Sequence, residues 1–189
     1  MKKISVFIKS VALIYVFLGF FGFASATDFK LPNYKFDKSK EPIYLVDKLP
    51  LKGDMTISFD FSLDKAFNSK SSSQYQGLFE TALGNTGVRI EIDKKRETWD
   101  LLIGDISGKF DVYNLGKLPN PGVWTKVKIQ ILNQSSDPKN NIILSINDKK
   151  TVDSNLVFVK FLTNKVTIGY GISPERKFHG SIRNFIISR

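Results

Sequence analysis

The sequence of 189 residues contains no cysteine and a single histidine, His179. Without cysteine the chain cannot form a disulfide, hold a thiolate-ligated zinc or iron–sulfur centre, or use a thiol nucleophile. One histidine also excludes a zinc site built from several imidazoles. A Ser-His-Asp triad would have to use His179, and no G-x-S-x-G segment presents a serine. We therefore predict neither a metal site nor a bound cofactor.

Long apolar stretches are also lacking after the first segment, residues 1–26. That segment begins with lysines, continues through an apolar stretch at residues 11–23, and ends in Ala24-Ser25-Ala26. This order is typical of a secretory signal peptide with an A-x-A cleavage site. Its apolar stretch is shorter than the roughly 20 residues of a spanning helix, although an uncleaved anchor is the alternative. We expect an exported protein, periplasmic or extracellular, with no transmembrane segment in the mature chain.

Acidic residues are fewer than basic ones, 18 against 28, which gives a net charge of +10 at pH 7. A basic surface attracts acidic partners over long range. The expected partners are therefore a glycan, an anionic surface polymer, or a protein of the envelope or matrix. Export makes nucleic acid an unsuitable partner. The alternative reading is that the lysines only keep the protein soluble.

Alternation of apolar and polar residues dominates the chain after residue 53. Residues 55–63 place five apolar side chains on one face, and similar alternation recurs near residues 88–92, 99–103, 127–131 and 142–146. Such alternation predicts half-buried strands, about ten in all. The predicted fold class is an all-β, two-sheet antiparallel β-sandwich.

The predicted domain organisation has three parts. A signal peptide at 1–26 is followed by a leader with a first strand at 27–52, and then by the sandwich at 53–189. The leader carries Phe29, Tyr34 and Phe36, which could dock on the sandwich.

Three segments, in order, resemble the laminin-G-like branch of the concanavalin A-like lectin/glucanase jelly rolls. They are PGVWTKVKI at 121–129, NIILSINDKK at 141–150, and the closing pair VTIGYG at 166–171 with FHGSIRNFII at 178–187. The resemblance implies a concanavalin A-like jelly roll, with the glycine of the last segment lying where a strand passes a bulky neighbour. It also leaves calcium open as a ligand. Residues 85–87, however, read Asn-Thr-Gly where some members carry a calcium-binding acid, which argues against calcium.

Glucanases of the same superfamily use two carboxylates on one strand, about 5 Å apart in retaining enzymes. Glu91 and Asp93 share a face in this way, because residues i and i+2 of a strand point to the same side. The family pattern then needs a further acid where this chain has Lys95 and Arg96. The sequence therefore predicts a protein that is not an enzyme, with a divergent glycoside hydrolase as the minor alternative.

A binding surface is predicted where three successive strands align their outward residues. We expect the ligand-binding residues to be Arg89, Glu91, Asp93, Asp100, Asp111 and Tyr113. Carboxylates and a guanidinium would bind sugar hydroxyls, and Tyr113 would face a pyranose ring. Two other sites are the expected loops at residues 75–76 and 105–108, whereas Trp99 and Trp124 fit the core or a sheet margin better.

These observations favour an exported, non-catalytic recognition domain that binds carbohydrate or a partner in the cell envelope or matrix. The alternative is a structural or assembly protein of the cell surface that does not bind sugar. The two differ in a testable feature: a polar and aromatic surface suits the first, and a large exposed apolar patch suits the second.

Overall fold

The computed structural model describes most of the chain after the predicted signal segment. The described residues are 29–36, 43–45, 54–65, 67, 73–81, 87–104, 109–132, 141–154, 166–170 and 175–188. The predicted signal peptide and the expected loop at 105–108 lie outside them.

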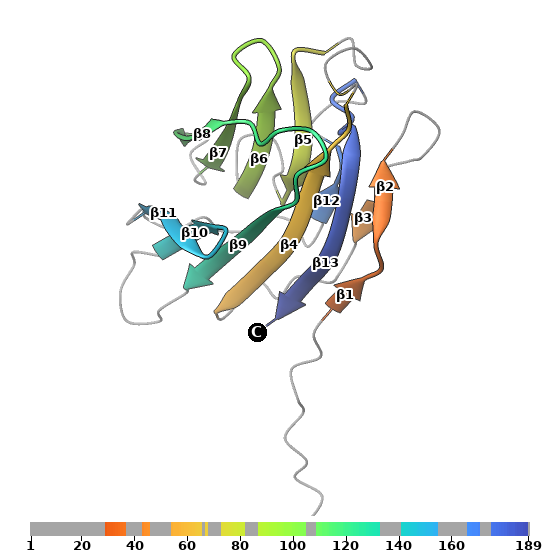
Figure 1. Ribbon diagram of the computed structural model, residues 1–189. Helices are drawn as coiled ribbons and strands as arrows, with labels where there is room; N and C mark the ends of the chain where they lie inside the picture. Colours follow the sequence, from red (N-terminus) through yellow and green to blue (C-terminus); the bar gives the residue numbers. More distant parts are fainter. Residues whose placement is uncertain are drawn as a thin grey trace, which may run out of the picture.

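Two antiparallel sheets face each other (Figure 1). Sheet A comprises β1 (Phe29–Leu31), β2 (Tyr34–Phe36), β4 (Met55–Leu63), β9 (Thr125–Leu132), β10 (Asn141–Ile146), β11 (Lys149–Ser154) and β13 (Gly180–Ser188). Its order is β1-β13-β4-β9-β10-β11, and β2 also pairs with β13. Sheet B comprises, in order, β3 (Ile43–Leu45), β12 (Val166–Ile168), β5 (Tyr75–Glu80), β6 (Gly87–Asp93), β7 (Thr98–Gly104) and β8 (Phe110–Lys117). The prediction of a two-sheet antiparallel β-sandwich is confirmed.

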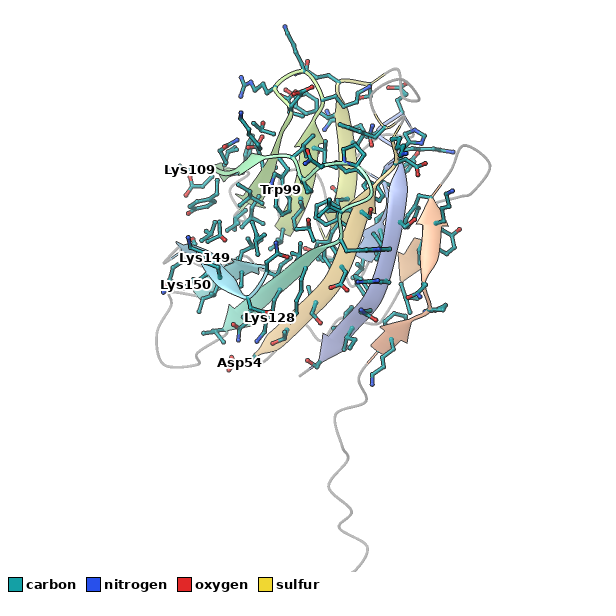
Figure 2. All side chains as sticks on the ribbon, viewed as in Figure 1. Asp54, Trp99, Lys109, Lys128, Lys149 and Lys150 are labelled. Carbon is teal, nitrogen blue, oxygen red and sulfur yellow. The ribbon has the colours of Figure 1, made fainter. Side chains whose placement is uncertain are left out.

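The core lies between the sheets, where the alternating apolar residues meet. Phe59 of β4 stacks with Phe79 of β5 and Phe185 of β13, at centroid distances of 6.1 and 5.9 Å. Trp99 of β7 packs on Phe61 at 5.2 Å and is buried between the sheets (Figure 2). Burial of such large side chains is the main favourable term in folding.

The predicted leader, residues 27–52, contributes strands to both sheets: β1 and β2 belong to sheet A, and β3 pairs with β12 in sheet B. β1 pairs with residues 185–187 of β13, and β2 pairs with residues 180–182. Phe36 at the end of β2 is buried, and its ring lies edge-on to Phe178 at 5.7 Å. Among the described residues, no helix is long and apolar enough to span a bilayer.

Gly180 occupies the crowded position that was expected for the glycine of the last strand. A Cβ built there would lie 2.2 Å from the carbonyl oxygen of Ser62 and 2.5 Å from the ring of Phe178. Only glycine fits at this separation, because any side chain would overlap backbone atoms that cannot rotate away.

The expected loop at residues 75–76 is wrong, since Tyr75 begins β5. Gln76 points into the core, where its amide donates to the Phe67 carbonyl at 2.9 Å and accepts from the His179 backbone N–H at 3.1 Å. Gly77 and a register shift between Gly77 and Phe79 interrupt the alternation of apolar residues. The period-two signal of a strand is therefore absent from this part of the sequence.

Candidate functional site

Four of the six predicted binding residues lie on one face of sheet B. In the register of β6, β7 and β8, Glu91 is opposite Asp100, which is opposite Asn114. Two residues from Glu91 on β6, Arg89 is opposite Leu102 of β7. Because alternate residues share a face, Arg89, Glu91, Asp93 and Asp100 all point away from the core.

The other two, Asp111 and Tyr113, point to the opposite face, and their placement in one patch is wrong. Tyr113 pairs with the buried Leu101 and Asp111 pairs with Ile103. The Tyr113 hydroxyl donates to Ser154 Oγ of β11 at 3.1 Å, so the ring bridges the two sheets along the flank where β8 and β11 lie (Figure 1).

The error arises from ambiguous periodicity in β8. Phe110 and Val112 are apolar and two residues apart, as expected of side chains that face the core, yet they are 46% and 55% exposed. Tyr113 and Leu115 lie on the other face of the strand and pack against the core. A strand with apolar residues in both phases does not fix its own orientation, and a shift of one residue reverses every side chain.

Arg89 and Glu91 belong to a buried ion-pair network rather than to an open patch. Arg89 donates to Glu80 Oε1 from Nη2 at 2.8 Å and from Nε at 3.1 Å. Its Nη1 lies 3.6 Å from Glu91 Oε1, which also accepts from Arg176 at 2.8 Å. The side chains of Arg89, Glu80 and Glu91 are only 9%, 5% and 8% exposed. Burial raises the pKa of Glu80, and the adjacent guanidinium of Arg89 partly offsets that rise.

Asp93 stabilises the turn between β6 and β7. Its Oδ1 accepts from the backbone N–H groups of Lys95 and Arg96 at 2.9 and 3.1 Å, and both its oxygens accept from Gln74. Glu91 and Asp93 are thus both buried and engaged in structural contacts. Neither carboxylate of the glucanase-like pair is in position to act on a glycosidic bond.

The exposed part of this face lies on β7 and β8. We call it the β7–β8 face and define it by Asp100, Leu102, Phe110, Val112 and Asn114, which share one side of the sheet. Asn114 Nδ2 donates to Asp100 Oδ1 at 2.7 Å, and the Asn114 side-chain oxygen accepts from the Gly116 N–H at 3.1 Å. Exposed Phe110 lies four residues along β8 from Asn114, with Val112 between them. The fixed amide and carboxylate can bind the hydroxyls of one sugar unit, and the aromatic ring can pack on the C–H face of another.

The periodicity error also concealed Phe110, Val112 and Asn114 as candidate residues. Only Asp100 was predicted correctly as an outward and accessible group. The pair Tyr113 and Leu115 could have indicated that Phe110, Val112 and Asn114 face outward, because these two apolar residues lie on the opposite strand face from Phe110.

Several lysines lie on or next to strands of both sheets. Lys109 precedes β8, Lys149 and Lys150 lie on the β10–β11 hairpin, and Lys128 is on β9 (Figure 2). Within the described part of the chain, no three histidine or carboxylate side chains come together as potential metal ligands.

The described residues define a two-sheet β-sandwich with a polar and aromatic surface on one sheet. No protein-family model matches this sequence, and no curated protein matches it. The fold is similar to the botulinum neurotoxin serotype D binding domain (TM-score 0.63, 14% identity, covering 83% of this chain and 39% of that chain). It is also similar to the receptor binding domain of botulinum neurotoxin D, with a TM-score of 0.62 and 14% identity, covering 86% of this chain and 44% of that chain. A third similar structure is the botulinum neurotoxin type G receptor binding domain, with a TM-score of 0.53 and 12% identity, covering 86% of this chain and 42% of that chain.

This chain therefore spans less than half the length of these structures. At such low identity the likeness shows the fold alone, and a fold by itself does not determine function.

Proposed function

We propose that this protein is an exported, non-catalytic recognition domain that binds carbohydrate through the β7–β8 face. One observation carries the proposal: exposed Phe110 lies on the same sheet face as the hydrogen-bonded Asp100–Asn114 pair. Binding residues held on rigid strands lose little freedom when a ligand binds. The predicted signal segment supports export, and the receptor-binding domains of similar fold support a binding role.

The ion-pair network on the neighbouring strands β5 and β6 supports recognition rather than catalysis. Arg89 and Arg176 together balance the charges of Glu80 and Glu91, and the Arg89–Glu80 pair joins β6, the strand next to β7, to β5. Glu91 of this network is the cross-strand neighbour of Asp100. Retaining hydrolysis would need two accessible carboxylates about 5 Å apart, and Glu91 and Asp93 are both buried.

We also propose that the sandwich is a laminin-G-like member of the concanavalin A-like jelly rolls. The order of the segments supports this assignment, since 121–129 leads into β9, 141–150 forms β10 and its turn, and the closing segments hold β12 and β13. The turn at Asn147-Asp148 lacks the usual glycine, but both residues adopt left-handed φ values of 49° and 64°. Asn and Asp tolerate that conformation better than other residues, so the tight hairpin still forms.

Assembly through β8 is the second candidate function. β8 is the last strand in the order of sheet B, and it exposes Phe110 and Val112. An exposed apolar edge can pair with another chain. Concentration-dependent self-association that Val112→Lys abolishes, with no sugar bound, would favour this function over recognition.

Carbohydrate recognition is tested with Phe110→Ala and Asn114→Ala in the purified protein. Titration calorimetry with a glycan that the wild type binds should show an affinity about tenfold lower for each variant, equivalent to about 1.4 kcal/mol. The unfolding midpoint should stay nearly constant, because both side chains are exposed. Val123→Ala, an exposed apolar residue before β9 on the other sheet, is the matched control. Unchanged affinity in both β7–β8 variants would remove this face as the binding site.

A further inference from the structure

Trp124 is the one of the two tryptophans that the fold leaves at the surface. It is 38% exposed, whereas Trp99 is 2% exposed. It follows a tight turn in which Gly122 has a φ of 83° and donates its N–H to the Leu63 carbonyl at 2.9 Å. The turn is thus fixed to the end of β4, and Trp124 is held on the outer face of sheet A, beside exposed Val123.

Arg183 of β13 lies over the ring of this tryptophan. Its guanidinium carbon is 4.0 Å from the centroid of the Trp124 ring, a cation–π contact. The Arg183 Nε donates to Asp60 Oδ2 at 3.0 Å, and Asn184 Nδ2 donates to the same oxygen at 2.8 Å. Asn184 has a φ of 53° within a bulge of β13, which turns its amide toward Asp60 on β4. The guanidinium is therefore fixed in both position and orientation.

Several polar atoms of this cluster remain without protein partners. Among the described residues, Nη1 and Nη2 of Arg183, Oδ1 of Asp60 and the indole N–H of Trp124 make no hydrogen bond. The Arg183 side chain is 38% exposed, so part of it is accessible to a ligand. A planar guanidinium with two free nitrogens matches the two oxygens of a carboxylate.

The local charges favour a ligand with a single acid over a dense polyanion. Asp60 offsets Arg183, and the nearby Lys126 is paired with Asp148 at 2.8 Å. The hydrogen bond with Asp148 raises the pKa of Lys126, so this lysine stays charged and paired. Asp60 would repel a second negative group, but its Oδ1 can accept from a hydroxyl.

We propose that the Trp124–Arg183 cluster, built from Trp124, Arg183, Asp60 and Asn184, is a second binding site, specific for a carboxylated sugar of the hexuronic acid class. The Arg183 fork binds the carboxylate, Asp60 Oδ1 accepts from a ring hydroxyl, and the part of the indole that Arg183 leaves exposed contacts C–H groups of the ring. This site lies on sheet A, on the opposite side of the sandwich from the β7–β8 face. It therefore goes beyond the proposed function and can succeed or fail independently of it.

Calorimetry at physiological salt with the full chain tests the site. The probes are the methyl glycosides of glucuronic, galacturonic and mannuronic acid, which carry one carboxylate each, and each is paired with its methyl ester, which is neutral but otherwise similar. We expect at least one acid to bind and its ester to bind about tenfold more weakly, equivalent to about 1.4 kcal/mol. Arg183→Lys keeps the charge but loses the planar fork, so the affinity for the acid should fall about tenfold. Trp124→Ala should weaken the acid and the ester alike.

Two controls separate this site from the other face and from unfolding. Phe110→Ala should leave uronate binding unchanged, and the urea midpoint of Arg183→Lys should match that of the wild type. In a Trp99→Phe variant the remaining fluorescence comes from Trp124, and it should change on uronate binding. The proposal is overturned if none of the three monosaccharide acids binds, if acid and ester bind equally, or if Arg183→Lys binds like the wild type.

Discussion

Replacing Arg89 with methionine should reduce the free energy of unfolding at pH 7 by about 3 kcal/mol. Arg89 faces two buried carboxylates, Glu80 at 2.8 Å and Glu91 at 3.6 Å. Glu91 keeps a second partner, Arg176, at 2.8 Å, so the variant leaves only Glu80 without its close cation. Removing one member of a buried ion pair typically costs about 3–5 kcal/mol, and a single unpaired carboxylate places this variant at the lower end of that range.

The loss should depend on pH in a defined direction. Burial raises the pKa of Glu80 above its ordinary value of 4.5 already in the wild type, and removing Arg89 raises this pKa further. A carboxyl group whose pKa is higher in the folded state destabilises the fold only when it is ionised. The difference between wild type and variant should therefore be small near pH 4 and should grow as the pH rises through the folded-state pKa toward 7.

Urea unfolding followed by tryptophan fluorescence measures this difference. Arg96→Met is the matched control, because the Arg96 side chain is 74% exposed and its loss should change stability by no more than about 0.5 kcal/mol. If Arg89→Met unfolds like the control while sugar binding disappears, then Arg89 contacts ligand and its structural assignment is wrong.

Two further variants test the register and the packing of the sandwich. Tyr113→Phe removes the hydroxyl that donates to Ser154 at 3.1 Å, so the free energy of unfolding in urea should fall by about 0.5–1.5 kcal/mol. Glycan binding measured by calorimetry should stay unchanged. Unchanged stability with weakened glycan binding would instead show that Tyr113 contacts the ligand. Gly180→Ala places a Cβ 2.2 Å from the Ser62 carbonyl oxygen and should lower the free energy of unfolding by about 3 kcal/mol in the same assay. If the variant is as stable as the wild type, β4 and β13 are further apart than described.

The fold was predictable because burial follows period-two alternation in its long strands. In β4, Met55, Ile57, Phe59 and Phe61 are all buried, as their spacing predicts. Within residues 27–52 the sequence predicted a leader with a single first strand and did not show β1 and β2 as separate strands, because three residues carry too little periodicity to define a strand. Their pairing with β13 depends on contacts about 150 residues apart in sequence, which no local pattern reveals.

The candidate site was predictable only in part, and for two physical reasons. The alternation of apolar and polar residues correctly predicts that Arg89 and Glu91 point away from the core. It does not show whether other residues cover that outward face of the sheet. Here the ion pairs with Glu80 and Arg176 bury both residues. In β8, apolar residues in both phases left the orientation undetermined, so Tyr113 was placed on the wrong side. Trp124 lies at a sheet margin, as its sequence position suggested, but its contact with Arg183 depends on tertiary structure.

The measurement that tests carbohydrate recognition most directly is a glycan array probed with the purified protein at physiological salt, with calcium and with a chelator. We predict selective retention of a few related glycans, equal in both conditions, and a loss of that signal in the Phe110→Ala, Asn114→Ala double variant. Retention of no glycan at physiological salt, with only charge-driven binding at low salt, would contradict the account and leave assembly through β8 as the function to pursue.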